Sequence, residues 1–163
     1  GIEAAQPGLF VNAPYVLTPT TKTTAQGLSL LMELIEHLGA KLYQCSPEEH
    51  DQAVAWISHL PVMVSASLIG ACGSEENAQI LQLAQQLASS GFRDTSRVGG
   101  GNPELGVMMA QFNQVSLLRS LSSYRQQLDQ VINFIEQEQW PELSQFLTQT
   151  QGDRPGYVLT RTD

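Results

Sequence analysis

The chain has 163 residues, of which 42% are hydrophobic and 15% are charged, enough apolar material for one folded domain with a hydrophobic core. Its formal net charge of −8, with eight Lys and Arg against sixteen Asp and Glu, excludes the basic stripe that follows a phosphate backbone. No uninterrupted apolar run approaches the roughly 18 residues of a membrane span, and the first residues lack a signal-peptide pattern. We therefore expect a cytoplasmic protein that binds neither nucleic acid nor membrane.

The amino-terminal part combines strand and helix patterns. Residues 10–18 are rich in β-branched and aromatic side chains, which predicts a strand. Apolar residues at helical spacing over 28–38 predict a helix that ends at Gly39, and residues 40–45 predict a second strand. Two strands leave sheet edges and one face uncovered, so we expect the end of a larger sheet. The chain begins at Gly1 rather than Met, and we expect it to be a piece of a longer protein.

From Ser46 onward the sequence predicts helices. Ser46 and Glu49 form a capping box with Pro47 at the first helical position, which opens a helix. Pro61 should kink this helix or start a new one. Further helices are expected over residues 75–89, over 103–139 with a break at Asn113, and over 140–147, with a loose tail after Gly152.

A long apolar stripe follows the break. Its members recur every three or four residues and are Leu117, Leu121, Tyr124, Leu128, Val131, Ile132 and Ile135. A stripe that spans several helical turns must be buried, and the other helices offer little to cover it. We therefore expect a homodimer that forms through the helical region.

Residues 91–102, which read GFRDTSRVGGGN, are expected to form a loop that binds an anion. Arg93 and Arg97 lie four residues apart, and a guanidinium binds a carboxylate or phosphate through two hydrogen bonds. Asp94 could orient one Arg or accept from a ligand amine. The alternative is that both Arg pair with surface Glu or cap a helix. The triplet 99–101 lacks the spacing of a dinucleotide fingerprint or P-loop, and it indicates a flexible or left-handed turn.

Two histidines lie on the helix that opens at Pro47. His50 and His59 are separated by two and a half turns of a straight α-helix, so their side chains should project from opposite faces and hold no metal together. Each is either structural or faces a cleft where it could move a proton or bind a hydroxyl. Cys45 and Cys72 lack disulfide or metal spacing and are expected to be buried free thiols. We expect no metal site and assign no catalytic residue in this chain.

Residues 50–61 read HDQAVAWISHLP, and residues 89–105 read SSGFRDTSRVGGGNPEL. In this order and at this separation, the two motifs resemble those of the prephenate/arogenate dehydrogenase family of tyrosine biosynthesis, and most of all its arogenate-using members. The resemblance implies a mainly α fold. Residues 1–47 would be the last strand-helix-strand of a truncated dinucleotide-binding α/β domain, and residues 48–163 an all-helical dimerisation and substrate-binding domain.

The resemblance also implies an activity and a site. Members transfer a hydride from the substrate ring to NAD(P) as the ring loses carbon dioxide. The cofactor, with NADP favoured, would be bound mainly by amino-terminal motifs that this chain lacks, so the chain alone should be inactive. The resemblance assigns a substrate carboxylate to Arg97. It also assigns substrate-binding positions to Arg93, Asp94, His50 and His59.

Two positions depart from some prephenate-preferring relatives of that family. Gly106 stands where they have Trp, and Val62 stands where they have His. A pocket that is less aromatic and less basic favours arogenate over prephenate as the substrate. The alternative from another class is a non-catalytic helical module for dimerisation or for binding a small acidic metabolite.

Overall fold

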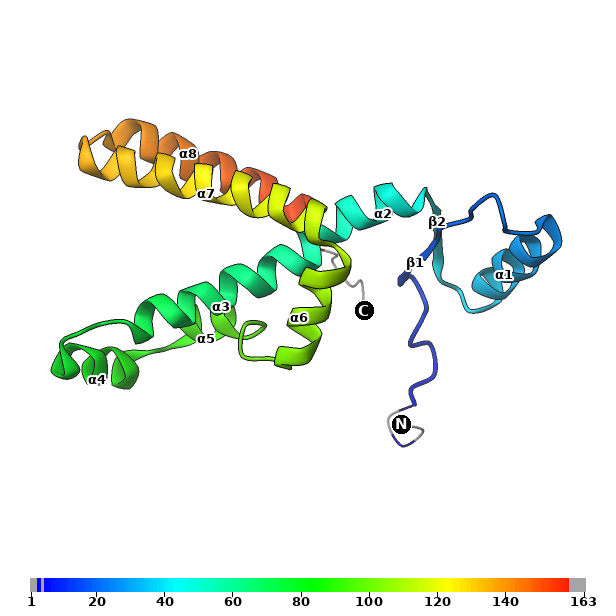
Figure 1. The fold of residues 1–163 in the computed structure, drawn as a ribbon, viewed down its shortest axis with the longest axis horizontal. Helices are drawn as coiled ribbons and strands as arrows, with labels where there is room; N and C mark the ends of the chain where they lie inside the picture. The colour runs from blue at the N-terminus through cyan, green and yellow to red at the C-terminus, as the bar shows by residue number, and fades with distance from the viewer. Residues whose placement is uncertain (1–2, 4, 159–163) are drawn as a thin grey trace. The chain divides into compact units, whose positions relative to one another are not determined.

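The computed structural model describes residue 3 and residues 5–158, and the chain divides into two compact units, Gly1–Leu117 and Leu118–Asp163. The first unit contains β1 (Pro14–Leu17), α1 (Ala25–His37), β2 (Lys41–Gln44), α2 (Pro47–Val54), the π-helical segment η2 (Ala55–His59), α3 (Leu60–Gly73), α4 (Ala78–Leu87), α5 (Ser90–Ser96) and α6 (Pro103–Phe112). The second contains most of α7 (Gln114–Glu136), α8 (Trp140–Asp153) and the 3-10 turn η3 (Arg154–Gly156) (Figure 1). The predicted class, mainly α with an amino-terminal strand-helix-strand, is confirmed.

The two strands pair in parallel across the crossover helix α1, with Pro14 opposite Lys41 and Leu17 opposite Gln44. Gly39 ends the helix with a left-handed φ of 69°, as its position predicted. The first strand begins later than expected because Asn12 also has a left-handed φ, 60°, and donates its backbone N–H to the Gly39 carbonyl. A left-handed residue interrupts the extended backbone of a strand, so β1 begins only at Pro14.

The predicted capping box opens α2. The Glu49 amide donates to Ser46 Oγ at 3.1 Å, and the Ser46 amide donates to Glu49 Oε2 at 2.8 Å. The bond from the Ser46 backbone, with a further contribution from the Ser46 side chain, lowers the pKa of Glu49. Pro61 lies in the first turn of α3, which begins at Leu60 without a side-chain cap, so the expected start of a new helix at this proline is confirmed. The wider π-helical turn η2 lies directly before α3 and connects it to α2.

The joined helix Pro47–Gly73 has the length and composition of a membrane-spanning helix, with a mean hydropathy of 1.6 over its most apolar window. The expectation concerned uninterrupted apolar runs, and polar residues such as Ser58 and His59 do interrupt this helix, whereas a window average tolerates them. Length and composition alone are weak evidence for a membrane, because core helices of globular proteins share them.

The segment expected to be one loop contains a helix. α4 ends at Leu87, and Ala88 and Ser89 adopt extended conformations before α5 begins at Ser90. Only the residues from Arg97 to Asn102 connect α5 to α6. Asn102 caps α6 by accepting from the Glu104 amide at 2.9 Å. The predicted break at Asn113 is confirmed, because its backbone, with φ −131°, ends α6.

In the second unit, α7 and α8 lie side by side (Figure 1). The rings of Phe134 and Phe146 pack between them with centroids 6.4 Å apart. The turn between the helices places Glu138 at a left-handed φ of 50°. α8 continues to Asp153, beyond its predicted end, and the expected loose tail includes residues 159–163, which lie outside the described residues.

Few apolar side chains are buried within the described chain. The buried ones are Leu17, Ile35, Ala55, Leu60 and Leu117. Of the predicted α7 stripe, Leu117 is buried, whereas Leu128 remains 47% exposed and Ile135 51% exposed. The expectation of buried thiols is wrong as well, because Cys72 is exposed and Cys45 is only partly covered. The helices therefore leave much of their apolar surface without a cover among the described residues.

Candidate functional site

The predicted site residues fall in two places within the first unit. Arg93 and Asp94 lie on α5, and Arg97 follows it directly. His50 lies on α2, and His59 closes the π-helical segment η2. Among the described residues, no hydrogen bond or ion pair joins the arginine group to the histidine group.

Arg93 and Asp94 form an ion pair on the surface of α5. Arg93 Nε donates to Asp94 Oδ1 at 2.9 Å, and Nη2 reaches Oδ2 at 3.5 Å. Both side chains are largely exposed, so the pair adds little to stability. Its effect is local, because Asp94 orients the Arg93 guanidinium and compensates its charge.

Arg97, unlike Arg93, has no ion-pair partner among the described residues. It stands at the carboxyl-terminal cap of α5 with a helical backbone, φ −54° and ψ −47°, and its side chain is exposed. Within the part of the chain that the structure describes, no carboxylate pairs with its guanidinium. The alternative of a surface ion pair therefore holds for Arg93 only, and its partner is Asp94 rather than the expected Glu. The Arg97 guanidinium is open to an anionic ligand, and a carboxylate matches its geometry.

The backbone around Arg97 is attached to α3 by a residue that sequence analysis missed. Ser65 is only 2% exposed; its hydroxyl donates to the Thr95 carbonyl at 2.9 Å and accepts from the Gly99 amide at 2.8 Å. The signal available in the sequence was a hydroxyl within an otherwise apolar helix. Its partners lie about thirty residues further along the chain, so no local pattern indicated them.

Within the glycine triplet, Gly99 serves this attachment. A turn does form here, since the Gly101 amide donates to the Val98 carbonyl at 3.4 Å. The left-handed form of the expected turn is wrong, because the left-handed glycines of the described residues are Gly8 and Gly39. A Cβ on Gly99 would overlap the backbone of Ser65 and Ala66. Glycine is required at position 99 because this loop touches the backbone of α3.

The two histidines have different partners. His50 Nδ1 lies 3.3 Å from Asp51 Oδ1, at a partly exposed surface. His59 Nδ1 lies 3.3 Å from Nδ2 of Asn113, a buried residue whose same nitrogen donates to the Asp51 carbonyl at 2.7 Å. An amide nitrogen only donates, so Nδ1 of His59 must accept.

The π-helical segment also changes the geometry assumed for this pair. A rotation of two and a half turns between His50 and His59 holds only for a straight α-helix. The five residues from Ala55 to His59 follow the wider π turn instead, so the premise of that prediction is wrong. π-helical turns are frequent at functional sites because they redirect side chains.

The described residues do not form a metal centre or a dinucleotide cradle. No group of three His, Cys, Asp or Glu side chains comes together within the described chain. In the turn between β1 and α1, the Thr20 and Lys22 amides donate to Thr23 Oγ1 and Thr20 Oγ1, and Thr24 Oγ1 accepts from Gly27. A pyrophosphate cradle needs free amides in a glycine-rich turn, so this turn does not fit one.

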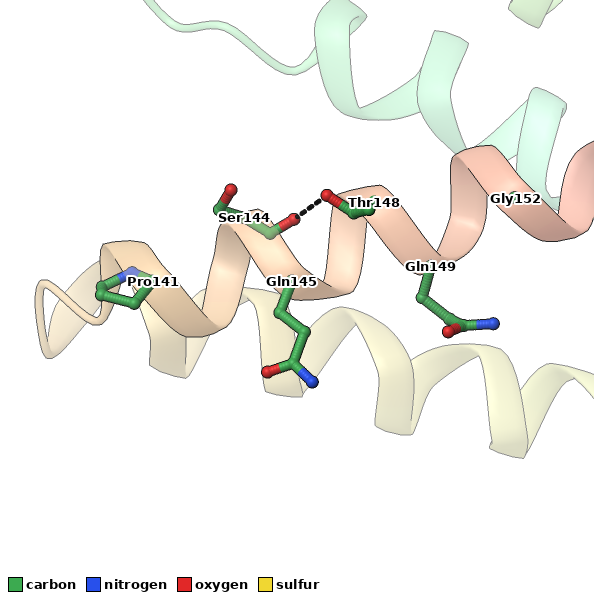
Figure 2. A pocket seen from close by; sticks show the side chains of 6 residues that line it. All are labelled: Pro141, Ser144, Gln145, Thr148, Gln149 and Gly152. Atoms are coloured by element: carbon green, nitrogen blue, oxygen red, sulfur yellow. Dashed lines mark hydrogen bonds between the residues drawn. The ribbon is translucent and has the colours of Figure 1, made fainter.

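A surface hollow lies elsewhere, on α8. Its lining residues all come from that one helix and are Pro141, Ser144, Gln145, Thr148, Gln149 and Gly152 (Figure 2). Thr148 Oγ1 donates to the Ser144 carbonyl at 2.8 Å, so its hydroxyl is used within the helix. The hollow contains none of the predicted site residues and no ionisable group.

Comparison with known families identifies both parts of the chain. The model described as "Prephenate dehydrogenase, dimerization domain" matches residues 46–149. The model described as "Prephenate dehydrogenase, nucleotide-binding domain" matches residues 1–44. The first of these alone covers more than half of the chain.

Individual relatives agree with the family models. Prephenate dehydrogenase of Bacillus subtilis is 32% identical over 98% of this chain, but the chain spans only 42% of that protein. The crystal structure of Synechocystis arogenate dehydrogenase is 64% identical, with a TM-score of 0.89 over 97% of this chain and 57% of that chain. A third match is the crystal structure of prephenate dehydrogenase from A. aeolicus in complex with hydroxyphenyl propionate and NAD+. The match covers 97% of this chain and 55% of the A. aeolicus chain. Its TM-score is 0.87 at 23% identity, which is evidence for the fold alone.

Proposed function

Because the chain belongs to the prephenate dehydrogenase family, we propose that it is part of an enzyme that decarboxylates arogenate oxidatively with NADP. The observation that carries this proposal is the 64% identity to Synechocystis arogenate dehydrogenase over 97% of the chain. Arogenate rather than prephenate is the substrate that this similarity favours. The chain spans about half the length of that relative, so the proposed activity belongs to the whole enzyme and not to these residues alone.

The proposal divides the work between two parts of that enzyme. Residues 1–47 are the last strand-helix-strand of a nucleotide-binding domain, and residues 48–163 form the helical domain. The family matches to residues 1–44 and 46–149 support this boundary. The amides between β1 and α1 are already hydrogen-bonded to threonine hydroxyls. The cofactor phosphates are therefore bound by residues other than these, and the chain alone is inactive.

Arg97 binds a carboxylate of the substrate in this proposal. Its guanidinium is exposed and has no ion-pair partner among the described residues, whereas that of Arg93 is paired with Asp94. Two parallel hydrogen bonds to a carboxylate fix its orientation as well as its position. Arg93, Asp94, His50 and His59 then surround the substrate.

The helical domain also supplies a homodimer interface. The exposed apolar residues of α7 and the apolar helix Pro47–Gly73 lack a cover among the described residues. The family description of residues 46–149 as a dimerization domain supports a second copy as that cover. Burial against a second copy, rather than against lipid, accounts for this apolar surface and is consistent with a cytoplasmic enzyme.

The test is a kinetic comparison in the dehydrogenase that carries this chain together with its nucleotide-binding domain. Activity is measured with arogenate and prephenate, each with NADP and NAD. We expect the highest kcat/KM with arogenate and NADP. Arg97→Ala should lower kcat/KM by roughly 30- to 900-fold, since losing a charged partner costs about 2 to 4 kcal/mol. Arg154→Ala, which removes an exposed Arg that is not among the predicted site residues, is the control.

Two results would contradict the proposal. An unchanged kcat/KM in Arg97→Ala would remove the carboxylate role from this residue. Equal or better turnover of prephenate would reverse the substrate assignment. Light scattering of the same preparation tests the homodimer, because a monomeric mass at micromolar concentration would exclude it.

A further inference from the structure

A single buried hydroxyl holds the backbone on both sides of Arg97. Ser65 Oγ donates to the carbonyl of Thr95, two residues before Arg97, and accepts from the amide of Gly99, two residues after it. Ser65 lies in the interior of α3 and is 2% exposed. The two bonds therefore fix the ends of a five-residue segment with Arg97 at its centre.

The orientation of this hydroxyl is specific to Ser65. Ser67 lies two residues further on the same helix, and its hydroxyl donates back to the Met63 carbonyl at 2.8 Å, the usual arrangement for Ser within a helix. Ser65 instead bonds to a different element of the fold. α5 packs against α3 at this point, and the absence of a Cβ on Gly99 allows the loop to touch the helix backbone.

We propose that Ser65 is a positioning residue for Arg97. It holds the backbone of residues 95–99 against α3. The Arg97 side chain therefore extends from a backbone whose position and orientation are already fixed when a substrate carboxylate binds. An Arg on a loose loop would lose more conformational freedom on binding, which weakens the complex. This inference rests on the proposed function, because it requires that Arg97 binds the substrate.

The chemistry of the attachment suits this role. The Ser65 hydroxyl carries no net charge, and it contacts the backbone of the segment rather than the guanidinium. A carboxylate in the place of Ser65 would compete with the substrate carboxylate for Arg97. A neutral hydroxyl fixes the position of the Arg and leaves its charge available.

The experiment is a double-mutant cycle on kcat/KM for arogenate in the dehydrogenase that carries this chain. It compares the unmodified enzyme, Ser65→Ala, Arg97→Ala and the variant with both substitutions. We expect Ser65→Ala to lower kcat/KM about tenfold in the unmodified background and to have no further effect once Arg97 is Ala. Ser67→Ala, the same change two residues away on α3, should leave kcat/KM within about twofold.

The cycle separates positioning from a purely structural role. If Ser65 only joins α5 to α3, its substitution lowers kcat/KM by the same factor in both backgrounds, and this additive result would overturn the inference. If Arg97→Ala itself leaves kcat/KM unchanged, the proposed role of Arg97 fails instead. Should Ser65→Ala not fold, Ser65→Cys replaces it in the same cycle, because the thiol has a similar size but donates and accepts weakly.

Discussion

The close approach of Gly99 to α3 predicts a specific sensitivity to one methyl group. In Gly99→Ala the new Cβ overlaps backbone atoms of Ser65 and Ala66, which have no room to move aside as a flexible side chain would. The loop must therefore withdraw from the helix, and both hydrogen bonds of the Ser65 hydroxyl are lost or stretched. Overpacking costs about 1 to 3 kcal/mol, and each hydrogen bond contributes about 1 kcal/mol. The expected loss in the free energy of unfolding is about 3 to 5 kcal/mol.

The neighbouring glycine supplies the control. In Gly100→Ala the nearest atom to the new Cβ is the Arg97 carbonyl oxygen at 3.9 Å, an ordinary contact. Its φ is not left-handed, so the substitution restricts the unfolded chain and should stabilise the fold by up to about 1 kcal/mol. Urea unfolding followed by circular dichroism, at one protein concentration, measures both variants. Equal midpoints for the two variants would refute the reasoning.

Three further predictions concern the histidine pair and the helix ends. Asn113→Ala removes the buried amide that donates to the Asp51 carbonyl and contacts His59 Nδ1, so the free energy of unfolding should fall by about 1 to 3 kcal/mol, measured by urea unfolding. Hydrogen bonds from Ser46 lower the pKa of Glu49 in the folded chain. The stabilising contribution of the Glu49 carboxylate is therefore present above its unfolded-state pKa and is lost as the pH falls through its folded-state pKa. Ser46→Ala should raise the NMR titration midpoint of the Glu49 carboxyl. Gly39→Ala forces a left-handed φ of 69° on a residue with a Cβ, so the free energy of unfolding should fall by about 1 to 2 kcal/mol, measured by urea unfolding.

Local signals in the sequence predicted local structure well. The capping box at Ser46, the left-handed Gly39, the cap at Asn102 and the break at Asn113 all depend on residues within a few positions of each other. Such interactions are visible in any short window of sequence. The sequence could therefore locate most helix ends in advance.

Structure that depends on distant partners was not predictable in this way. The strand before α1 is shortened by a bond from Asn12 to Gly39, and the helix at 90–96 forms where it packs on α3. The π-helical turn at 55–59 was hidden because a proline normally signals a kink or a new helix. In each case the deciding contact joins residues that are far apart along the chain or depends on how the helix accommodates Pro61.

For the candidate site, too, the sequence predicted the residue types but not the contacts between them. Its residue types, two Arg and an Asp in a glycine-flanked segment, stand out in the sequence. The difference between Arg93 and Arg97 does not, because it depends on which guanidinium meets a carboxylate in the folded chain. The hydroxyl of Ser65 within an apolar helix did not reveal its partners, since a serine in such a helix commonly bonds to the preceding turn, as Ser67 does.

The contrast between the two arginines indicates how a protein keeps a binding charge available. Arg93 is held by an ion pair with Asp94, so a ligand carboxylate would first have to displace that partner. Arg97 is held through its backbone by a neutral hydroxyl, and its charge has no compensating partner among the described residues. Attachment through the backbone restricts the segment without neutralising the guanidinium. A substrate carboxylate at Arg97 therefore gains a new ion pair rather than an exchange of one partner for another.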